Sequence, residues 1–544
     1  VFYSGAVHHM EGYATYDKSF GGHNLTLMGG FNREDNSYLA MTGKRANPLG
    51  VTEHSLNLAE GDAVISESDD KYASQSTFFR VNYNYNQRYL LEVNGCYNIS
   101  SKFPQGQRDA MFFSVSGGWR VSEEAFFAPL KDKIDNLKIR ASYGSLGNQN
   151  VGSYDYLSIM SLTQSSYLLE GQRPYYTSSP QPKSLNYTWE KAMTIDLGLD
   201  LTMLENRLSL TADIYQRDTK QMLAPFHSLP SVFGATVPKE NNAKLRTRGW
   251  EASLGWTDNI DLGGKPFTYG VRLGISDYTS KIKEYYNPSN YLGDYYVGQT
   301  IGEIWGLTND GYFLTDEEAK HGALLETSSN KAYASAGCIK FKDFDNDGII
   351  SKGEWTLQDH GDFKVIGNTT PRYQYSITLN ASYAGFDINA FFRGVGQRDV
   401  YPDKESAAFW GPYSRKYMVM PKFVGENIWT EDNPNAYFPR PQAYISTGSQ
   451  DLSFAQTKYL QNAAYLRLKN LTMGYTLPKS LTEKLHIEKL RVYFTGQNLF
   501  EFTPLTDAYD PEGLAHDPDA GESVGIGTAY PIQRTYSFGV ELQF

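Results

Sequence analysis

The chain has 544 residues, of which 40% are hydrophobic, 20% are charged and 14% are aromatic, so it is not a disordered chain. A formal net charge of −11 argues against a nucleic-acid-binding protein, because such a protein needs a basic surface to meet phosphates. No apolar run of about 18 residues is present to form a transmembrane helix, and the first residues carry no signal peptide.

Apolar and polar residues alternate along most of the chain, which is the period-two pattern of β-strands. Many alternating segments run to about 10–14 residues, the length of a tilted membrane-spanning strand, whereas strands of a soluble sandwich average about 5–6. The pattern predicts about fifteen strands in an all-β fold, a transmembrane antiparallel β-barrel. We expect them near 8–20, 23–33, 74–86, 87–100, 108–120, 136–145, 187–201, 206–219, 245–258, 266–281, 371–384, 385–397, 464–476, 490–501 and 532–544.

The connections between these strands alternate in length. Every second one is short: Gly21-Gly22, Asn86-Gln87, 121–135, the residues around Glu205, 259–265, Ala384-Gly385 and 477–489. The others, except 101–107, are long: 34–73, 146–186, 220–244, 282–370, 398–463 and 502–531. Short turns on one side and long loops on the other are typical of an outer-membrane barrel, with the long loops outside the cell.

Several blocks of the final third carry a family resemblance. They are IKFKDFDNDGIISKGEW, VIGNTTPRYQYSITLNASYAGFDINAFFRGVGQRDVY, YLRLKNLTMGYTLPKSL, LRVYFTGQNLFEFT and YPIQRTYSFGVELQF. In content, order and spacing they resemble the SusC/RagA family of TonB-dependent outer-membrane importers of Bacteroidota. Upstream, FGGHNLTLMGGFN and LKIRASYGSLGNQN resemble barrel strands of the same family, so the resemblance covers nearly the whole chain.

The resemblance implies an architecture and partners. Family members have a 22-stranded barrel behind an N-terminal plug and a TonB-contacting segment, so residues 1–544 are expected to be the C-terminal part of such a barrel, without the plug and first strands. The odd strand count fits this expectation, and the sheet is not expected to close. The resemblance further implies a SusD-like lipoprotein lid, outer-membrane lipid around the barrel, energy from TonB, an oligosaccharide or peptide substrate, and pairing of two such complexes.

The stretch DFDNDGIISKGEW, residues 343–355, matches the calcium-binding loop D-x-D-x-D-G-x5-E. The predicted ligands are the carboxylates of Asp343, Asp345 and Asp347, the backbone carbonyl of Ile349 and the carboxylate of Glu354. Members of the resembled family usually carry Asn at position 3 and Asp at positions 9 and 12, so Asp359 or Asp362 stays open as the distal ligand in place of Glu354. We expect a structural Ca²⁺, with Mg²⁺ as the alternative, because crowded carboxylates repel one another without a cation.

The remaining residues favour transport over catalysis. The sequence contains no Gly-rich phosphate loop, nucleophile elbow or CxxC, and the two cysteines, Cys96 and Cys338, suggest neither a metal site nor a disulfide, so an enzyme is not expected. Tyrosines crowd two long loops, at 154–176 and 285–296, and we expect most of them, like Trp410 and Trp429, to pack loops or to meet a protein partner. Two alternatives stay open: a passive or surface-binding barrel without energy coupling, and a calcium-dependent extracellular adhesin.

Overall fold

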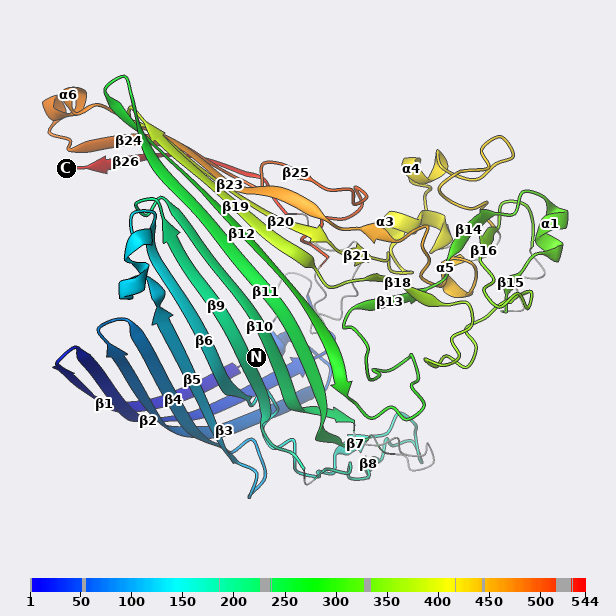
Figure 1. Cartoon of the computed structure of the whole chain (residues 1–544). Coiled ribbons are helices and arrows are strands. Elements are labelled where there is room, and N and C mark those ends of the chain that lie inside the picture. Colours follow the sequence, from blue (N-terminus) through cyan, green and yellow to red (C-terminus); the bar gives the residue numbers. More distant parts are fainter. Residues whose placement is uncertain are drawn as a thin grey trace.

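The computed structural model describes residues 2–50, 55–184, 186–225, 235, 237–326, 334–415, 417–442, 446–514, 530 and 532–544. Most of these residues belong to one 16-stranded sheet, in which fifteen strands follow in chain order and β25 pairs beside β23 (Figure 1). The fifteen are β1 (Phe2–Phe20), β2 (His23–Arg45), β3 (Ala63–Tyr85), β4 (Tyr89–Ser100), β5 (Asp109–Arg120), β6 (Ile134–Asn148), β9 (Glu190–Met203), β10 (Leu208–Pro225), β11 (Lys239–Leu262), β12 (Lys265–Glu284), β19 (Arg372–Tyr383), β20 (Phe386–Gln397), β23 (Tyr465–Thr476), β24 (Lys489–Gln497) and β26 (Thr535–Gln543).

Each of the fifteen predicted strands is present, which confirms the predicted all-β barrel fold. Within the described residues the path has two ends, β1 and β26, so this sheet is not closed. Among these residues, too, there is no helix with the length and apolar character needed to span a membrane.

Several predicted strand ends were wrong, because the strands are longer than the alternation indicated. β2 and β3 stay paired from His23↔Tyr85 to Arg45↔Ala63, so most of the predicted loop 34–73 is strand. β11 and β12 are joined by Gly263 and Gly264 alone, not by a connection over 259–265. Where both faces of a strand meet water, the apolar–polar alternation disappears although the backbone ladder continues. Parts of the predicted long connections lie outside the described residues: 51–54, 185, 226–234, 236, 327–333, 416, 443–445, 515–529 and 531.

The two faces of the sheet differ in chemistry. One, here called the apolar face, carries an unbroken cross-strand row from β6 to β20, made of Leu137, Leu201, Leu210, Leu254, Leu273, Ile377 and Phe392. Its side chains are open to the surroundings; Leu197 is 50% exposed and its partner across the strands, Ile214, is 59% exposed. A solvated protein does not leave so large an apolar surface bare, so this face suits lipid.

The opposite face, here called the charged face, carries ion pairs between adjacent strands and between strands separated by one other strand. Arg140 on β6 contacts Asp200 on β9 at 3.0 Å and Asp213 on β10 at 2.9 Å. Arg491 on β24 donates to Asp387 on β20 at 2.6 Å. Charged side chains on this face therefore pair with one another across the strands, which suits the polar inner side of a barrel.

The long connections lie at one edge of the sheet and the short turns at the other (Figure 1). The short-turn edge includes η2 (Val121–Glu123), η3 (Ala125–Leu130), α6 (Lys479–Thr482) and η6 (Glu483–Leu485). The long connections contain η1 (Leu56–Leu58), β7 (Leu162–Gln164), β8 (Tyr175–Thr177), β13 (Glu303–Gly306), β14 (Asn309–Tyr312), α1 (Asp316–His321), β15 (Leu324–Leu325), β16 (Ile339–Phe341), β17 (Ile349–Ile350), β18 (Lys364–Asn368), β21 (Asp399–Val400), α3 (Ala407–Trp410), η5 (Gly411–Tyr413), α4 (Lys422–Gly425), α5 (Ser446–Ser449), β22 (Gln461–Asn462) and β25 (Glu501–Phe502). The predicted alternation of short and long connections is thereby confirmed.

Three of the long connections, 285–371, 398–464 and 498–514, pack together into one body, here called the loop layer. Its core joins Leu307 and Phe341 of the first connection, Trp410 and Phe438 of the second and Leu505 of the third. Backbone hydrogen bonds also link the connections; the N–H of Leu307 donates to the carbonyl of Ala455 at 2.8 Å. The loop layer is therefore a folded unit with its own hydrophobic core, held at the long-loop edge of the sheet.

Candidate functional site

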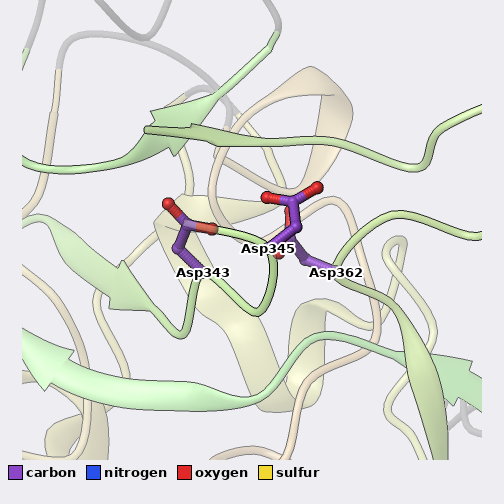
Figure 2. Close-up of side chains that lie close together, drawn as sticks. All are labelled: Asp343, Asp345 and Asp362. Atoms are coloured by element: carbon purple, nitrogen blue, oxygen red, sulfur yellow. The ribbon is translucent and has the colours of Figure 1, made fainter. Parts of the chain in front are cut away.

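Three aspartates come together in the loop layer beside the turn 343–354, here called the acidic turn. Asp343 and Asp345 belong to the turn between β16 and β17, and Asp362 precedes β18. One carboxylate oxygen of each lies within 4.8 Å of the other two, and Figure 2 shows the three side chains gathered around the turn. Hard carboxylate oxygens at this spacing are the ligands that Ca²⁺ and Mg²⁺ take in proteins.

The backbone of the acidic turn follows from its sequence. Gly348 has φ +83° and Asn346 has φ +62°, the left-handed conformation that these two residue types tolerate best. The carboxylate of Asp343 accepts hydrogen bonds from the N–H of Asn346 at 2.6 Å and from the N–H of Gly348 at 2.9 Å. The turn is thus closed by its own first aspartate, as the Asp-x-Asp-x-Asp-Gly pattern predicts.

The distal side of the cluster is formed by Asp362. Its carboxylate accepts from the N–H of Phe344 at 2.8 Å and from the N–H of Ser351 at 3.0 Å, so it ties both arms of the acidic turn together. Among the described residues, the group does not include Glu354. The N–H of Glu354 instead donates to the carboxylate of Asp359 at 3.1 Å. Of the three residues left open as distal ligand, Asp362 is the one that the fold brings to Asp343 and Asp345.

Among the described residues, the group does not include the predicted ligand Asp347 either. Asp347 uses one carboxylate oxygen to accept from the N–H of Ile349 at 2.7 Å. Ile349 and Ile350 form β17, which pairs in parallel with Leu324 and Leu325 of β15. Through β17 the acidic turn is paired with β15, and through Asp362 it is hydrogen-bonded to the chain just before β18. The full set of metal ligands stays a prediction.

The pKa is shifted in opposite directions at the two turn aspartates, Asp343 and Asp345. Burial favours the neutral form of Asp343, but the N–H groups of Gly348 and Asn346 outweigh it, and the pKa of Asp343 is lowered. At Asp345 the N–H of Asp347 favours the charged form, but desolvation and the negative charges of Asp347 and Asp362 outweigh it, and the pKa of Asp345 is raised. Asp345 thus carries the repulsion of the cluster, and a cation beside it would relieve that repulsion.

A second candidate region lies on the charged face of the sheet. A hollow of about 490 Å³ opens there between β10–β12 and β19–β23. Its charged lining residues are Asp213, Glu251, Arg393 and Lys469. Both signs of charge and the side-chain amides of Gln374 and Asn470 line this space. The wall can therefore contact polar solutes without favouring one sign of charge.

The charged face is joined to the loop layer by a buried arginine that the sequence analysis did not single out. Arg467, 3% exposed on β23, donates to Glu501 and to Asp510 and Glu512, the last two at 2.7 Å. Lys469 contacts Glu512 at 2.8 Å. The polar positions of YLRLKNL, Arg467 and Lys469, are the signal that could have revealed this cluster, because charge at alternate positions marks the inner face of a barrel strand.

Comparison with known proteins identifies the fold. Residues 3–499 match the model of the family described as TonB dependent receptor-like, beta-barrel. This chain belongs to that family. It is 29% identical to TonB-dependent receptor P3 of Formosa agariphila over 98% of this chain and 52% of the relative. It is 26% identical to TonB-dependent receptor SusC of Bacteroides thetaiotaomicron, over 98% of this chain and 49% of the relative.

Solved structures agree in fold. The chain superimposes on one chain of the structure of the RagAB peptide transporter with a TM-score of 0.78 and 21% identity, covering 100% of this chain and 56% of that one. The resemblance to SusC and RagA predicted from the sequence is therefore confirmed, and the family is one of receptors and transporters, not of enzymes. The chain spans about half the length of the curated relatives it matches.

Proposed function

We propose that this chain is the barrel of a TonB-energised outer-membrane importer of the SusC type, which takes up oligosaccharides or peptides. One observation carries the proposal: a sheet of the TonB-dependent receptor family has a lipid-compatible apolar face, a charged opposite face and a folded loop layer at one edge only. Such a wall suits passage of polar solutes across a membrane, and the loop layer suits selection at the entrance.

The proposal includes two partners. A SusD-like lipoprotein covers the long-loop edge, and TonB supplies the energy for transport. The similarity to SusC and to the RagAB peptide transporter supports both partners, and pairing of two such complexes is part of the same proposal.

Transport by the intact protein can be measured as uptake of labelled oligosaccharides and labelled peptides by cells that express the full-length transporter with its lid. We expect uptake of one class, and its loss when TonB is deleted or the proton-motive force is collapsed. Uptake that persists unchanged without TonB would support the passive barrel and contradict energy coupling.

The acidic turn is proposed to hold one structural Ca²⁺, or Mg²⁺ in its place, through Asp343, Asp345 and Asp362, with Asp347, the carbonyl of Ile349 and Glu354 as further predicted ligands. Support comes from the three carboxylate oxygens that lie within 4.8 Å of one another. The ion would stabilise the loop layer by linking the acidic turn to the residues before β18, and it would play no part in catalysis.

The ion can be tested in the intact transporter with the double variant D343N/D345N and, separately, with D362N. Elemental analysis after dialysis should show loss of about one divalent ion per chain, and hydrogen exchange should rise in 339–364 while the barrel stays folded. Asp432 is exposed in the same loop layer, so D432N is the matched control. Equal metal content in D343N/D345N and D432N would exclude the site.

A further inference from the structure

The connection between β5 and β6, residues 121–133, is longer than a chain reversal at this edge requires. On the same short-turn edge, β11 and β12 are joined by the two residues Gly263 and Gly264. The additional residues of 121–133 fold into η2 and η3 and expose apolar side chains. Phe126 is 65% exposed and Leu130 is 48% exposed; they are here called the apolar pair.

The connection is held firmly beneath the apolar pair. Phe127, which lies between the two residues, is 4% exposed. The carboxylate of Glu124 accepts hydrogen bonds from the hydroxyl of Tyr89 at 2.6 Å and from the indole N–H of Trp119 at 3.0 Å. It also lies 3.1 Å from the guanidinium of Arg88. Because the start of η3 is fixed in this way, the fold itself imposes the exposure of the apolar pair.

The side of the sheet to which the connection turns is set by Trp119. Trp119 pairs across the strands with Ile139, which stands two positions from Leu137 of the cross-strand row on the apolar face. Since every second side chain of a strand points to the same face, Trp119 belongs to the apolar face. The ring of Phe126 lies 6.5 Å from the Trp119 ring in edge-to-face geometry. Phe126 therefore continues the apolar face beyond the end of β5.

The height of the apolar band places Phe126 at its rim. On β5 the exposed apolar side chains of this face run from Met111 to Trp119. Eight steps of about 3.4 Å, on a strand tilted by about 40°, cover about 21 Å along the membrane normal. An outer-membrane barrel presents to lipid an apolar band about 25 Å tall, bordered by aromatic residues. Phe126, next to Trp119 on the short-turn side, supplies the remaining height.

The cover of Phe126 is identified as lipid by continuity and by the order of residues. Its ring contact with Trp119 joins it to the face that suits lipid. The exposed charged residues Lys131, Asp132 and Lys133 follow the apolar pair directly. Apolar and then charged residues are the order expected where a chain passes from acyl chains through headgroups into water. Short turns of such barrels face the periplasm, so the membrane surface concerned is the phospholipid leaflet on that side.

We propose that residues 121–133 bind the phospholipid surface of the periplasmic leaflet. Phe126 lies among the acyl chains below the headgroups, Leu130 follows it along η3, and the charged residues 131–133 lie among the headgroups. The segment fixes the height of the barrel in the membrane at this point of its circumference. The inference concerns neither the solute nor the energy source, so it stands apart from the proposed function.

The test uses the full-length transporter in the outer membrane of cells, with a photo-crosslinking amino acid in place of Phe126. After irradiation, mass spectrometry of the purified protein should detect a phospholipid adduct. The matched control carries the same amino acid in place of Glu205, whose side chain is 87% exposed in the β9–β10 turn of the same edge. We expect at least 10-fold more phospholipid adduct at position 126 than at position 205.

A spin label gives a second measurement of the same contact. In phospholipid vesicles, a nitroxide on F126C should be more accessible to oxygen than to a water-soluble nickel complex, and a nitroxide on E205C should show the reverse. Both positions are exposed, so the variants should fold, and heat-modifiable gel migration checks this before either measurement.

Three results would overturn the inference. They are an adduct at position 126 with a protein or with lipopolysaccharide, equal phospholipid adducts at positions 126 and 205, and a nitroxide at 126 as accessible to the nickel complex as one at 205. None of these results would bear on uptake, which is measured separately.

Discussion

A buried carboxyl in the loop layer makes its stability depend on pH. Asp451 is 4% exposed, and its Oδ1 has no hydrogen-bond partner among the described residues. Burial raises its pKa from 3.8 to about 6, although the N–H groups of Ile339, Asp451 and Leu452 favour the charged form. The titratable groups that feel its charge, Tyr312, Tyr401, Tyr413, Tyr459 and Cys338, carry no positive charge to compensate it.

The sign and size of this pH dependence follow from the raised pKa of Asp451. Because the folded-state pKa lies above 3.8, the protonated form favours the folded loop layer, and this contribution is complete below about pH 4. It is lost as the pH rises through about 6 and stays lost above it. A rise of about two units corresponds to about 3 kcal/mol at about 1.4 kcal/mol per unit.

We therefore expect the free energy of local unfolding of the loop layer to fall by about 3 kcal/mol between pH 4 and pH 7.5. The assay is hydrogen exchange of buried amides around Trp410 and Phe438, corrected for the intrinsic pH dependence of exchange. Asparagine mimics the neutral acid, so D451N should remove most of the slope, whereas the exposed-site control D432N should retain it. Equal slopes in D451N and the wild type would refute the reasoning.

Three further perturbations test other parts of the molecule. R467M leaves Glu501, Asp510 and Glu512 without their shared partner, so we expect a local loss of about 3–5 kcal/mol, measured as faster proteolysis within 498–514. L197R places a charge on the apolar face and should cost about 2–4 kcal/mol in refolding into bilayers, while T211R, on the charged face, should cost much less. F438A removes a fully buried ring from the loop layer and should destabilise that layer by about 3–5 kcal/mol, with heat-modifiable migration of the barrel unchanged.

The position of every main strand could be predicted because lipid on one side and water on the other impose period-two alternation. The row from Leu137 to Phe392 is apolar for that reason, because each strand contributes to it one of the alternate positions that point to the apolar face. Strand ends could not be predicted in the same way. In the unpredicted part of β2, residues such as Glu34, Asp35 and Asn36 pair with β3 through the backbone, and consecutive polar residues there leave no apolar alternation to detect.

The candidate metal site was predicted in part. Asp343, Asp345 and Gly348 follow from a local motif, because the geometry of the turn depends only on neighbouring residues. Asp362 lies outside the motif, and its carboxylate is held by hydrogen bonds from the N–H groups of Phe344 and Ser351, which form only in the folded loop. Trp410 and Trp429 were expected to pack loops, and both are buried in the core of the loop layer, as predicted.

The sequence by itself determined the strands, their order, the alternation of turn and loop lengths and the family, because each depends on periodicity or on contiguous motifs. Only the tertiary structure decided that three connections far apart in the chain share one core, that Arg467 binds three carboxylates and that Asp451 is buried. These contacts join residues separated by tens to hundreds of positions, and no local pattern encodes which of them meet. Residues 417–420 illustrate the difference: their apolar composition is plain in the sequence, but only the structure shows that Tyr417 and Val419 are exposed while Tyr413 and Val424 on either side are buried.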